Sequence, residues 1–339
     1  MGSSSSDLHH RQMALTTWLR QALSNSDICL ELVSGDASFR RYFRVLNHSQ
    51  SAIAVDAPAP HENCELFLQV AAAYRKAGVR VPNVLAEDAD AGFMCLEDFG
   101  DRLLLAEVNS SNCTELYGRS LDELIAIASV TQTCKGQLPA FNRAHLQREN
   151  ALFTDWLLGT HLQLELSDAE QTMLEWTFDA LIDNALSQPQ TGVHRDYHAR
   201  NIMLLEGDEV GIIDFQDAVY GAVTYDVVSL LRDCYIEWPD QWVDEMLFEW
   251  ARKAVAQGVF LAPDPEQLRR WFDLMGIQRH VKASGIFCRL CHRDGKTGYL
   301  NDIPLTLSYI AKFSKRHADT VALAEFIEHR VMPAWEAKG

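Results

Sequence analysis

The chain has 339 residues, 47% of them hydrophobic and 23% charged, so it can bury the core of about two domains, and general disorder is excluded. Its 47 acidic residues outnumber its 30 basic ones, and the net charge of −17 repels phosphate backbones and anionic membranes, so we expect no nucleic acid and no membrane as partner. No apolar run approaches the roughly 20 residues that cross a bilayer, no signal peptide is visible and nothing points to an obligate protein partner, so we predict a cytoplasmic protein.

The eight cysteines are dispersed along the chain, which predicts free buried thiols rather than disulfides. Cys288 and Cys291 have C-x-x-C spacing on a segment with a helical pattern. No second pair accompanies them, so we do not predict a zinc or redox site there.

The N-terminal third combines amphipathic and strand-like segments. Residues 1–14 are polar, and we predict a flexible tail or a tag remnant. Residues 15–23 carry apolar side chains at helical spacing, and residues 28–55 alternate with turns like antiparallel strands. A second helical stripe covers residues 66–77 and ends at Gly78, and strands are predicted at 81–85 and 93–96.

The remainder of the chain is predominantly helical. Apolar stripes predict helices around residues 121–128 and 153–157. Ser167 and Glu170 form a capping box that opens a further helix, whose apolar face reaches residue 185. Another helix is predicted to start at Tyr225.

Between these helices, residues 193–217 carry three oxygen-bearing side chains on two short predicted strands joined by a turn. Asn201 comes five positions after Asp196, and Asp214 comes thirteen positions after Asn201, behind an apolar run. A phosphoryl-transfer site needs such groups, because the protein positions a hydroxyl and holds Mg²⁺, which prefers hard oxygen ligands. The alternative is a polar turn whose acids are solvated.

These motifs resemble those of the protein-kinase superfamily. His194-Arg195-Asp196 with Asn201 is similar to its catalytic loop, and Asp214-Phe215-Gln216 is similar to its D-F-G motif. The resemblance implies an α+β, bilobal protein-kinase-like fold, with an antiparallel sheet plus helix in the N-lobe and a mainly helical C-lobe. It also implies that Asp196 accepts or orients the proton of the acceptor, while Asn201 and Asp214 bind Mg²⁺ for ATP. Asp226 resembles a buried structural acid that hydrogen-bonds the catalytic loop from beneath.

The same resemblance divides the chain into two lobes. We expect a nucleotide-binding N-lobe at residues 15–98, a hinge near residues 97–100, and a helical C-lobe at 101–339 with the catalytic loop and the acceptor site. At the hinge, adenine would take main-chain hydrogen bonds at about Glu97 and Phe99. The alternative for this segment is an ordinary strand-to-helix loop.

A turn of small residues between two predicted strands is the candidate phosphate-covering loop, because its hydroxyl and N–H groups can fold over phosphates. Its residues are Gly35, Asp36, Ala37, Ser38 and Phe39. The strand at residues 51–56 lacks the lysine that protein kinases carry, and the first lysine of the chain is Lys76. Arg41 and Arg44 are therefore the nearest candidate cations for phosphate, although arginines in a strand pair can equally be surface charges.

A local concentration of basic residues marks the C-terminal third of this acidic chain. The candidate acceptor contacts are Arg279, His280, Lys282 and Arg289. They suit a polar, anionic acceptor, whereas a cationic acceptor would be expected to meet acids. The alternative is a solvated helix face.

Within the superfamily, the chain resembles the aminoglycoside-phosphotransferase type of small-molecule kinase, because no activation segment separates Asp214 from the helix of Asp226. Residues 35–44, 55–58, 96–101, 196–201 and 278–280 together resemble the bacterial anomeric N-acetylmuramate/N-acetylglucosamine kinases of cell-wall recycling, over about residues 15–335. That resemblance implies transfer of the ATP γ-phosphate to the anomeric hydroxyl of an amino sugar, giving the sugar 1-phosphate. The lactyl carboxylate of N-acetylmuramate would suit the basic cluster.

Other functions stay open on the sequence alone. An aminoglycoside, choline or other amino-sugar kinase could share the fold. A metal-dependent phosphohydrolase would want a denser set of ligands and no hinge. A nucleotide-binding pseudokinase scaffold is disfavoured because Asp196 and Asn201 are both present.

Overall fold

The computed structural model describes residues 5–35, 40–58 and 63–338, and it divides into two compact units. The N-terminal unit comprises Met1–Arg102 together with Met203–Gln216, and the C-terminal unit comprises Leu103–Ile202 together with Asp217–Gly339. The predicted division into lobes at residues 15–98 and 101–339 stays a prediction. It does not anticipate that Met203–Gln216 returns to the N-terminal unit, since a linear reading of the pattern assigns each lobe one continuous segment.

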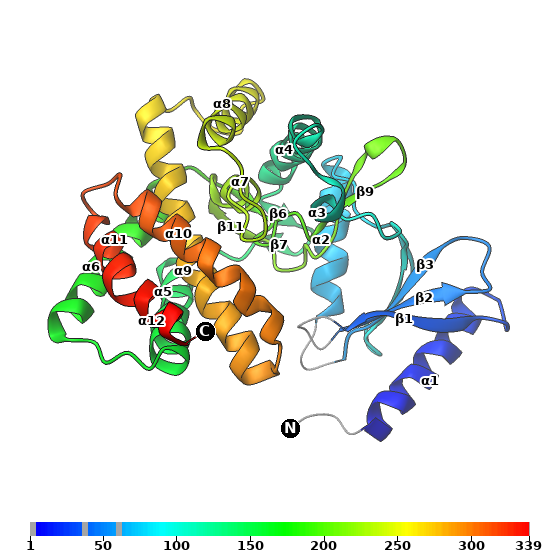
Figure 1. Cartoon of the computed structure of the whole chain (residues 1–339). Helices are drawn as coiled ribbons and strands as arrows, with labels where there is room; N and C mark the ends of the chain where they lie inside the picture. The colour runs from blue at the N-terminus through cyan, green and yellow to red at the C-terminus, as the bar shows by residue number, and fades with distance from the viewer. Residues whose placement is uncertain (1–4, 36–39, 59–62, 339) are drawn as a thin grey trace. The chain divides into compact units, whose positions relative to one another are not determined.

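The N-terminal unit is built on a five-stranded sheet in the order β1-β2-β3-β5-β4, with antiparallel pairing throughout (Figure 1). The antiparallel sheet plus helix expected from the sequence is therefore confirmed. The elements of this unit are α1 (Ser5–Ala22), β1 (Cys29–Gly35), β2 (Arg41–Leu46), β3 (Ala52–Asp56), α2 (Cys64–Lys76), β4 (Val84–Asp88), β5 (Phe93–Glu97) and the pair β9 (Ile202–Leu204) and β10 (Val210–Ile212), which the 3-10 helix η2 (Glu206–Asp208) joins, with β9 spanning the unit boundary.

Helix α1 packs on the sheet through Leu15 and Leu19, which are fully buried. It starts at Ser5, so residues 5–14 are helical rather than a flexible tail. The polar start of this helix is fixed by an ion pair, because the Arg11 guanidinium donates hydrogen bonds of 2.8 and 2.6 Å to the Asp56 carboxylate at the end of β3. A pairing between residues so far apart in sequence leaves no local pattern by which it could be predicted.

Helix α2 holds the segment that follows β10. The ring of Phe215 lies 4.7 Å from that of Phe67 and 5.7 Å from that of Tyr74, measured between centroids. All three side chains are buried. Phe215 is the middle residue of the D-F-G-like motif, so this contact fixes its neighbour Asp214 within the N-terminal unit.

The C-terminal unit is mainly helical, as expected (Figure 1). Its longest element is α9, which has 30 residues and packs against α5, α6, α7 and α10. The helices are α3 (Leu104–Glu107), α4 (Cys113–Ser129), α5 (Arg143–Leu152), the π-helical η1 (Phe153–His161), α6 (Asp168–Ser187), α7 (Tyr225–Leu231), α8 (Asp240–Ala256), α9 (Pro265–Asp294), the 3-10 helix η3 (Thr297–Asp302), α10 (Ile303–Ser314), α11 (Val321–Phe326), the π-helical η4 (Ile327–Val331) and α12 (Met332–Lys338). Two short strand pairs complete the unit, namely β6 (Gln132–Thr133) with β7 (Gly136–Gln137) and β8 (Gln190–Val193) with β11 (Val219–Ala222).

Two local features explain how α9 and its neighbours are positioned. The predicted capping box is present at the start of α6, where the Ser167 hydroxyl accepts from the Glu170 N–H and the Glu170 carboxylate accepts from the Ser167 N–H. Gly285 lets α9 approach α5, because a Cβ atom at this position would lie 2.3 Å from the carbonyl oxygen of Leu152. Any other residue would push the two helices apart.

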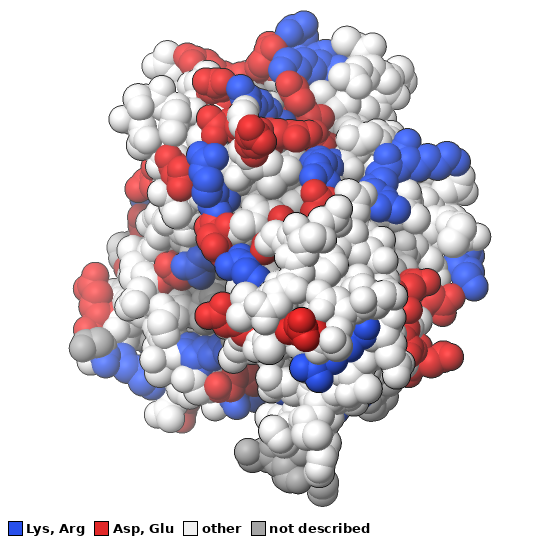
Figure 2. All heavy atoms as spheres, turned by 90° about the vertical axis from the view of Figure 1, so that its right-hand side faces the viewer, with Lys and Arg blue, Asp and Glu red and all other residues white. Residues whose placement is uncertain are grey.

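No helix within the described ranges is both long and apolar enough to span a membrane. On the face drawn in Figure 2, acidic and basic side chains alternate in small groups over the described residues.

Candidate functional site

The loop that carries Asp196 follows β8 and is fixed from below by two buried aspartates. Asp226, at the start of α7, accepts hydrogen bonds from the main-chain N–H groups of His194 (2.6 Å) and Arg195 (3.0 Å). Asp233, just beyond the end of α7, accepts one from the N–H of Ala199 (2.9 Å). The predicted role of Asp226 as a buried acid beneath the catalytic loop is therefore confirmed.

Arg195 adopts a strained backbone conformation, with a φ angle of 80°. Non-glycine residues rarely occupy this left-handed region, and they persist there only where the surroundings over-determine the conformation. Here the main-chain N–H is held by Asp226, and the guanidinium donates a 2.9 Å hydrogen bond to Glu149 Oε1 on α5. Strain of this kind clusters at functional sites.

Asp196 is anionic because it lies among cations. Desolvation on its own would raise the pKa of this carboxyl, but the positive charges of Lys282, Arg195 and Arg279 outweigh it and lower the pKa to about 2. The Asn201 side-chain N–H donates a 3.0 Å hydrogen bond to the main-chain oxygen of Asp196, which orients the Asn201 amide. The C-terminal unit therefore brings Asp196 and Asn201 together.

His198 is a neutral neighbour of Asp196. Burial lowers the pKa of its imidazole to about 4, against the opposing effect of the Asp196 charge. Its Nδ1 atom is buried and has no hydrogen-bond partner among the described residues. Buried polar atoms are normally paired, so this atom is a candidate contact for a bound polar molecule.

Lys282 and Glu149 form a buried ion pair beside this loop. Lys282 Nζ lies 3.0 Å from Glu149 Oε1 and donates a 2.9 Å hydrogen bond to the Tyr225 hydroxyl. Desolvation opposes the charged form of Lys282, but the Glu149 carboxylate outweighs it and raises the pKa of Lys282 to about 12. Glu149 was not anticipated from the sequence, because it comes from α5, far along the chain from the basic cluster.

Arg279 lies one turn before Lys282 on α9, with its guanidinium carbon 4.9 Å from the centroid of the Tyr225 ring. Its Nη1 atom is buried and has no hydrogen-bond partner among the described residues. Two of the four predicted acceptor residues, Arg279 and Lys282, therefore lie close enough to Asp196 for their charges to lower its pKa.

The other two predicted acceptor residues lie elsewhere on α9. His280 is buried, its Nε2 atom is 3.0 Å from the Arg232 carbonyl oxygen, and its ring stacks on Tyr309. Burial lowers the pKa of His280 to about 3, so the ring is neutral and packs between helices. Arg289 is about two turns beyond Lys282, and burial followed by the charge of Arg293 lowers its pKa.

Asp214 belongs to the N-terminal unit and also has a left-handed backbone, with a φ angle of 63°. Its Oδ1 atom accepts a 2.9 Å hydrogen bond from Gln216 Nε2 and lies 3.9 Å from Nη1 of Arg40, which is buried. Arg40 was not predicted from the sequence as a site residue. The signal that could have found it was the strand alternation, which places Arg40 on the same face as Arg44 and opposite Arg41.

The two arginines proposed for phosphate have carboxylate partners. Arg41 Nε donates a 3.1 Å hydrogen bond to Asp56, and Arg44 binds Asp98 and Asp101 at 2.7 and 2.8 Å. Phosphate would have to compete with these carboxylates, so contacts of Arg41 and Arg44 with ATP stay predictions.

The remaining N-terminal predictions concern main-chain contacts. The Glu97 N–H already donates to the Asn83 carbonyl at 2.8 Å, so an adenine could use the Glu97 carbonyl or the Phe99 N–H. Gly35 is the last residue of β1, and the other residues of the proposed phosphate loop, namely Asp36, Ala37, Ser38 and Phe39, lie outside the described residues.

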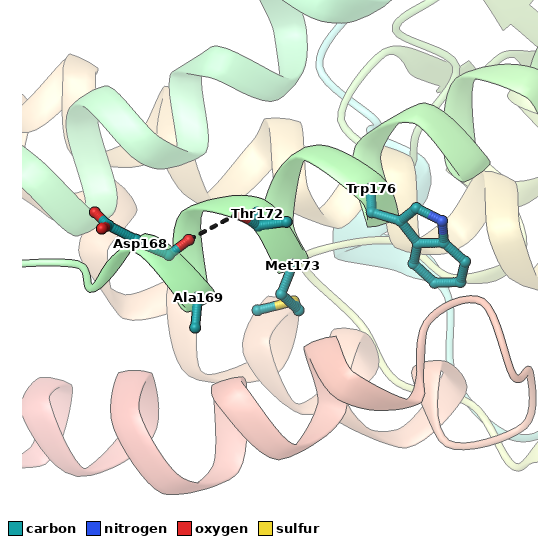
Figure 3. A pocket seen from close by; sticks show the side chains of 5 residues that line it. All are labelled: Asp168, Ala169, Thr172, Met173 and Trp176. Atoms are coloured by element: carbon teal, nitrogen blue, oxygen red, sulfur yellow. Dashed lines mark hydrogen bonds between the residues drawn. The ribbon is translucent and has the colours of Figure 1, made fainter.

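A shallow hollow opens at the start of α6 (Figure 3). It is lined by Asp168, Ala169, Thr172, Met173 and Trp176. The lining is mostly apolar, and it includes none of the candidate site residues. Its lining includes no cationic side chain that could bind the phosphates of a nucleotide.

The family model described as "Phosphotransferase enzyme family" matches residues 30–271. The chain belongs to this family. The predicted class of enzyme, a phosphotransferase, is therefore confirmed.

Three relatives of this family member are named N-acetylmuramate/N-acetylglucosamine kinase. The protein of Pseudomonas aeruginosa is 44% identical over 87% of the chain and 86% of its own length. Those of Pseudomonas putida and Neisseria meningitidis are 38% and 36% identical, over 94% and 92% of the chain and 96% and 94% of their own lengths.

Solved structures share the fold of this phosphotransferase. An ethanolamine kinase of Plasmodium vivax has a TM-score of 0.64 at 10% identity, covering 96% of the chain and 92% of its own. The aminoglycoside phosphotransferase APH(2'')-Ib with bound ADP has a TM-score of 0.58 at 16% identity, covering 88% and 98%. A choline kinase of Streptococcus pneumoniae has a TM-score of 0.61 at 12% identity, covering 89% and 99%. The bilobal α+β protein-kinase-like fold is confirmed.

Proposed function

We propose that this phosphotransferase moves the γ-phosphoryl group of ATP to the anomeric hydroxyl of N-acetylmuramate and N-acetylglucosamine, giving the sugar 1-phosphates in peptidoglycan recycling. The observation that carries the proposal is the set of relatives of this name, which are 36–44% identical over 87–94% of the chain. The partner is thus a small-molecule amino sugar, and use of ATP agrees with our expectation of a cytoplasmic protein.

Asp196 is the proposed catalytic residue. A carboxylate whose pKa is lowered to about 2 is a weak base, so it orients the hydroxyl and takes its proton late in the reaction. An anomeric hydroxyl is more acidic than an ordinary alcohol, which suits a weak base. The main-chain hydrogen bonds from the loop to Asp226 and Asp233 keep this carboxylate in position.

Asn201 and Asp214 are the proposed ligands of Mg²⁺. An amide oxygen and a carboxylate are hard donors, and two such groups suffice because Mg²⁺ keeps waters and phosphate oxygens as its other ligands. In the described part of the chain, no group of three or more His, Cys, Asp or Glu side chains could hold a metal ion. When bound, Mg²⁺ would neutralise charge on the triphosphate.

The proposed acceptor contacts are Arg279 and Lys282, which lie close enough to Asp196 to lower its pKa. Cations at this position suit an acceptor that carries a carboxylate, such as the lactyl group of N-acetylmuramate. We do not include His280, whose ring is committed to the packing between α9 and α10. The contact of Arg289 with the acceptor stays a prediction, because its charge is not among the main causes that lower the pKa of Asp196.

The proposal is tested by ATP-dependent release of ADP with four acceptors: N-acetylmuramate, N-acetylglucosamine, choline and an aminoglycoside. We expect activity with the two amino sugars, and phosphorus NMR should identify the product as a sugar 1-phosphate. Preferential phosphorylation of choline or the aminoglycoside, or phosphate on a different hydroxyl of the sugar, would contradict the proposal.

A further inference from the structure

The cations beside Asp196 are not equivalent, because one carboxylate neutralises two of them. Glu149 Oε1 accepts a hydrogen bond of 2.9 Å from Arg195 Nη2 and lies 3.0 Å from Lys282 Nζ. Glu149 itself is buried, with 7% of its surface exposed. A buried carboxylate shared by two cations leaves each of them with little remaining attraction for a further anion.

The position of this pair is fixed by the contact between α5 and α9. Gly285 lies against the main chain of Leu152, and the residues three positions earlier on each helix are Lys282 and Glu149. The Tyr225 hydroxyl holds the Lys282 ammonium from a third element, α7. Glu149 and Tyr225 therefore take two of the three N–H donors of Lys282, and the Glu149 charge offsets the attraction of the ammonium for a further anion.

Arg279 differs from Lys282 and Arg195 because it has no ion-pair partner among the described residues. Its guanidinium lies over the uncharged ring of Tyr225, and its buried Nη1 has no hydrogen-bond partner there. The charges of Asp196 and Asp226 act on it only from a distance. A partly buried guanidinium whose Nη1 is shielded from water without a hydrogen-bond partner can gain from binding an anion, and its planar donor fork matches a carboxylate.

We propose that, of the two candidate acceptor contacts, Arg279 is the one that binds the carboxylate of the acceptor and so distinguishes a carboxylated amino sugar from a neutral one, while Glu149 offsets the charges of Lys282 and Arg195. This inference rests on the proposed function. N-acetylmuramate carries a lactyl carboxylate that N-acetylglucosamine lacks, so the two sugars differ in the group that Arg279 would bind. Selectivity between them then depends on this one uncompensated cation.

The test measures the ratio of kcat/KM for N-acetylmuramate to kcat/KM for N-acetylglucosamine. Arg279→Gln should lower the ratio about 10- to 100-fold, the worth of a hydrogen-bonded charge pair. Glu149→Gln should leave the ratio equal or raise it, because it releases two cations. Arg293→Gln is the matched control, since Arg293 is an exposed arginine of the same helix paired with Asp294, and it should leave the ratio unchanged.

The methyl ester of N-acetylmuramate separates the effect of charge from that of size. The wild type should use the ester less well than the acid, and Arg279→Gln should use the two alike. If Arg279→Gln is unstable by thermal unfolding, Arg279→Lys keeps the charge without the planar fork and should lower the ratio by a smaller factor.

Two outcomes overturn the inference while leaving the proposed function intact. The first is an equal loss of kcat for both sugars in Arg279→Gln, which would place Arg279 at the transferring phosphoryl group. The second is a fall of the ratio in Glu149→Gln as large as in Arg279→Gln. A wild type that phosphorylates neither sugar would instead refute the proposed function.

Discussion

The Oδ2 atom of Asp226 accepts a 2.6 Å hydrogen bond from the main-chain N–H of His194, and its Oδ1 atom accepts another from Arg195. Both oxygens of one buried carboxylate therefore hold the main chain that leads into Asp196. The second of these bonds also stabilises the left-handed conformation of Arg195. The geometry of the loop that carries Asp196 thus depends on a residue that need not touch the substrate.

Replacing Asp226 by Asn should destabilise the protein and slow the reaction together. An amide can accept from only one of the two N–H groups through its oxygen, and its own N–H₂ would face the other, so we expect a loss of about 1–3 kcal/mol in the free energy of unfolding. Chemical denaturation and kcat should be measured on the same preparation. Asp240→Asn is the control, because Asp240 is a half-exposed residue of α8 paired with Lys312 and Arg316. Unchanged stability and kcat in Asp226→Asn would contradict the assignment.

Replacing Asp196 by Asn should lower kcat by about 10²- to 10⁴-fold, the usual contribution of a general base. The fold should survive, because the hydrogen bond from Asn201 goes to the main-chain oxygen of Asp196 rather than to its side chain. Steady-state kinetics and a thermal unfolding curve check the two parts of this prediction. A variant with near-normal kcat would remove Asp196 from the mechanism.

The pH dependence of kcat/KM should depend on the cations around Asp196, because they lower the pKa of its carboxyl. With a pKa of about 2, Asp196 is ionised at every pH above roughly 4, so it should cause no acid limb there in the wild type. Ionised Asp196 also stabilises the folded state. This stabilisation is fully present above the unfolded pKa and is lost only as the pH falls through about 2. Lys282→Met removes the largest of the charges that lower this pKa, so an acid limb should emerge at higher pH. An identical profile from about pH 4 to 8 in the variant would argue against this electrostatic coupling.

Asp233 should make folding stability decrease as the pH rises. Burial raises the pKa of its carboxyl to about 6, against an ordinary value of 3.8, in spite of the hydrogen bonds from Ala199 and Tyr235. A group with a raised folded pKa contributes stability that is full below the unfolded value and is lost as the pH passes the folded one. The loss amounts to about 3 kcal/mol by about pH 7. Asp233→Asn should flatten the dependence of the unfolding free energy between about pH 4 and 7, and a slope equal to that of the wild type would refute the assignment.

Arg40→Gln should raise the KM for ATP about 10-fold, because Arg40 is a buried cation next to the Asp214 carboxylate. Arg41→Gln should mainly cost stability, since its guanidinium binds the buried Asp56. The comparison requires KM for ATP and thermal unfolding of both variants. Should Arg41→Gln raise KM for ATP while Arg40→Gln leaves it unchanged, the original prediction for Arg41 would be favoured.

The parts of the fold and site that the sequence predicts are those with a local pattern. The capping box of Ser167 and Glu170, the stripe of α2 and the spacing of Asp196, Asn201 and Asp214 all depend on residues close in sequence. The sequence also identifies Asp226, because its motif follows Asp214 closely.

The residues that were missed depend on contacts between distant segments. Glu149 meets Lys282 only because Gly285 lets two helices approach, and Arg11 meets Asp56 across the N-terminal unit. His280 was predicted to contact the acceptor because it lies in a run of basic residues, but packing buries its ring. Charge counts alone cannot distinguish a cation that already has a partner from one that lacks it.

The return of Met203–Gln216 to the N-terminal unit has a consequence for biosynthesis. Phe215 packs on Phe67 and Tyr74, so the hydrophobic core under α2 is incomplete in a nascent chain until the ribosome has passed residue 216. The first hundred residues therefore cannot complete their fold until this later segment has been synthesised. A gene fragment that ends at Arg102 would encode a unit that lacks its last two strands and the aromatic side chain that closes it.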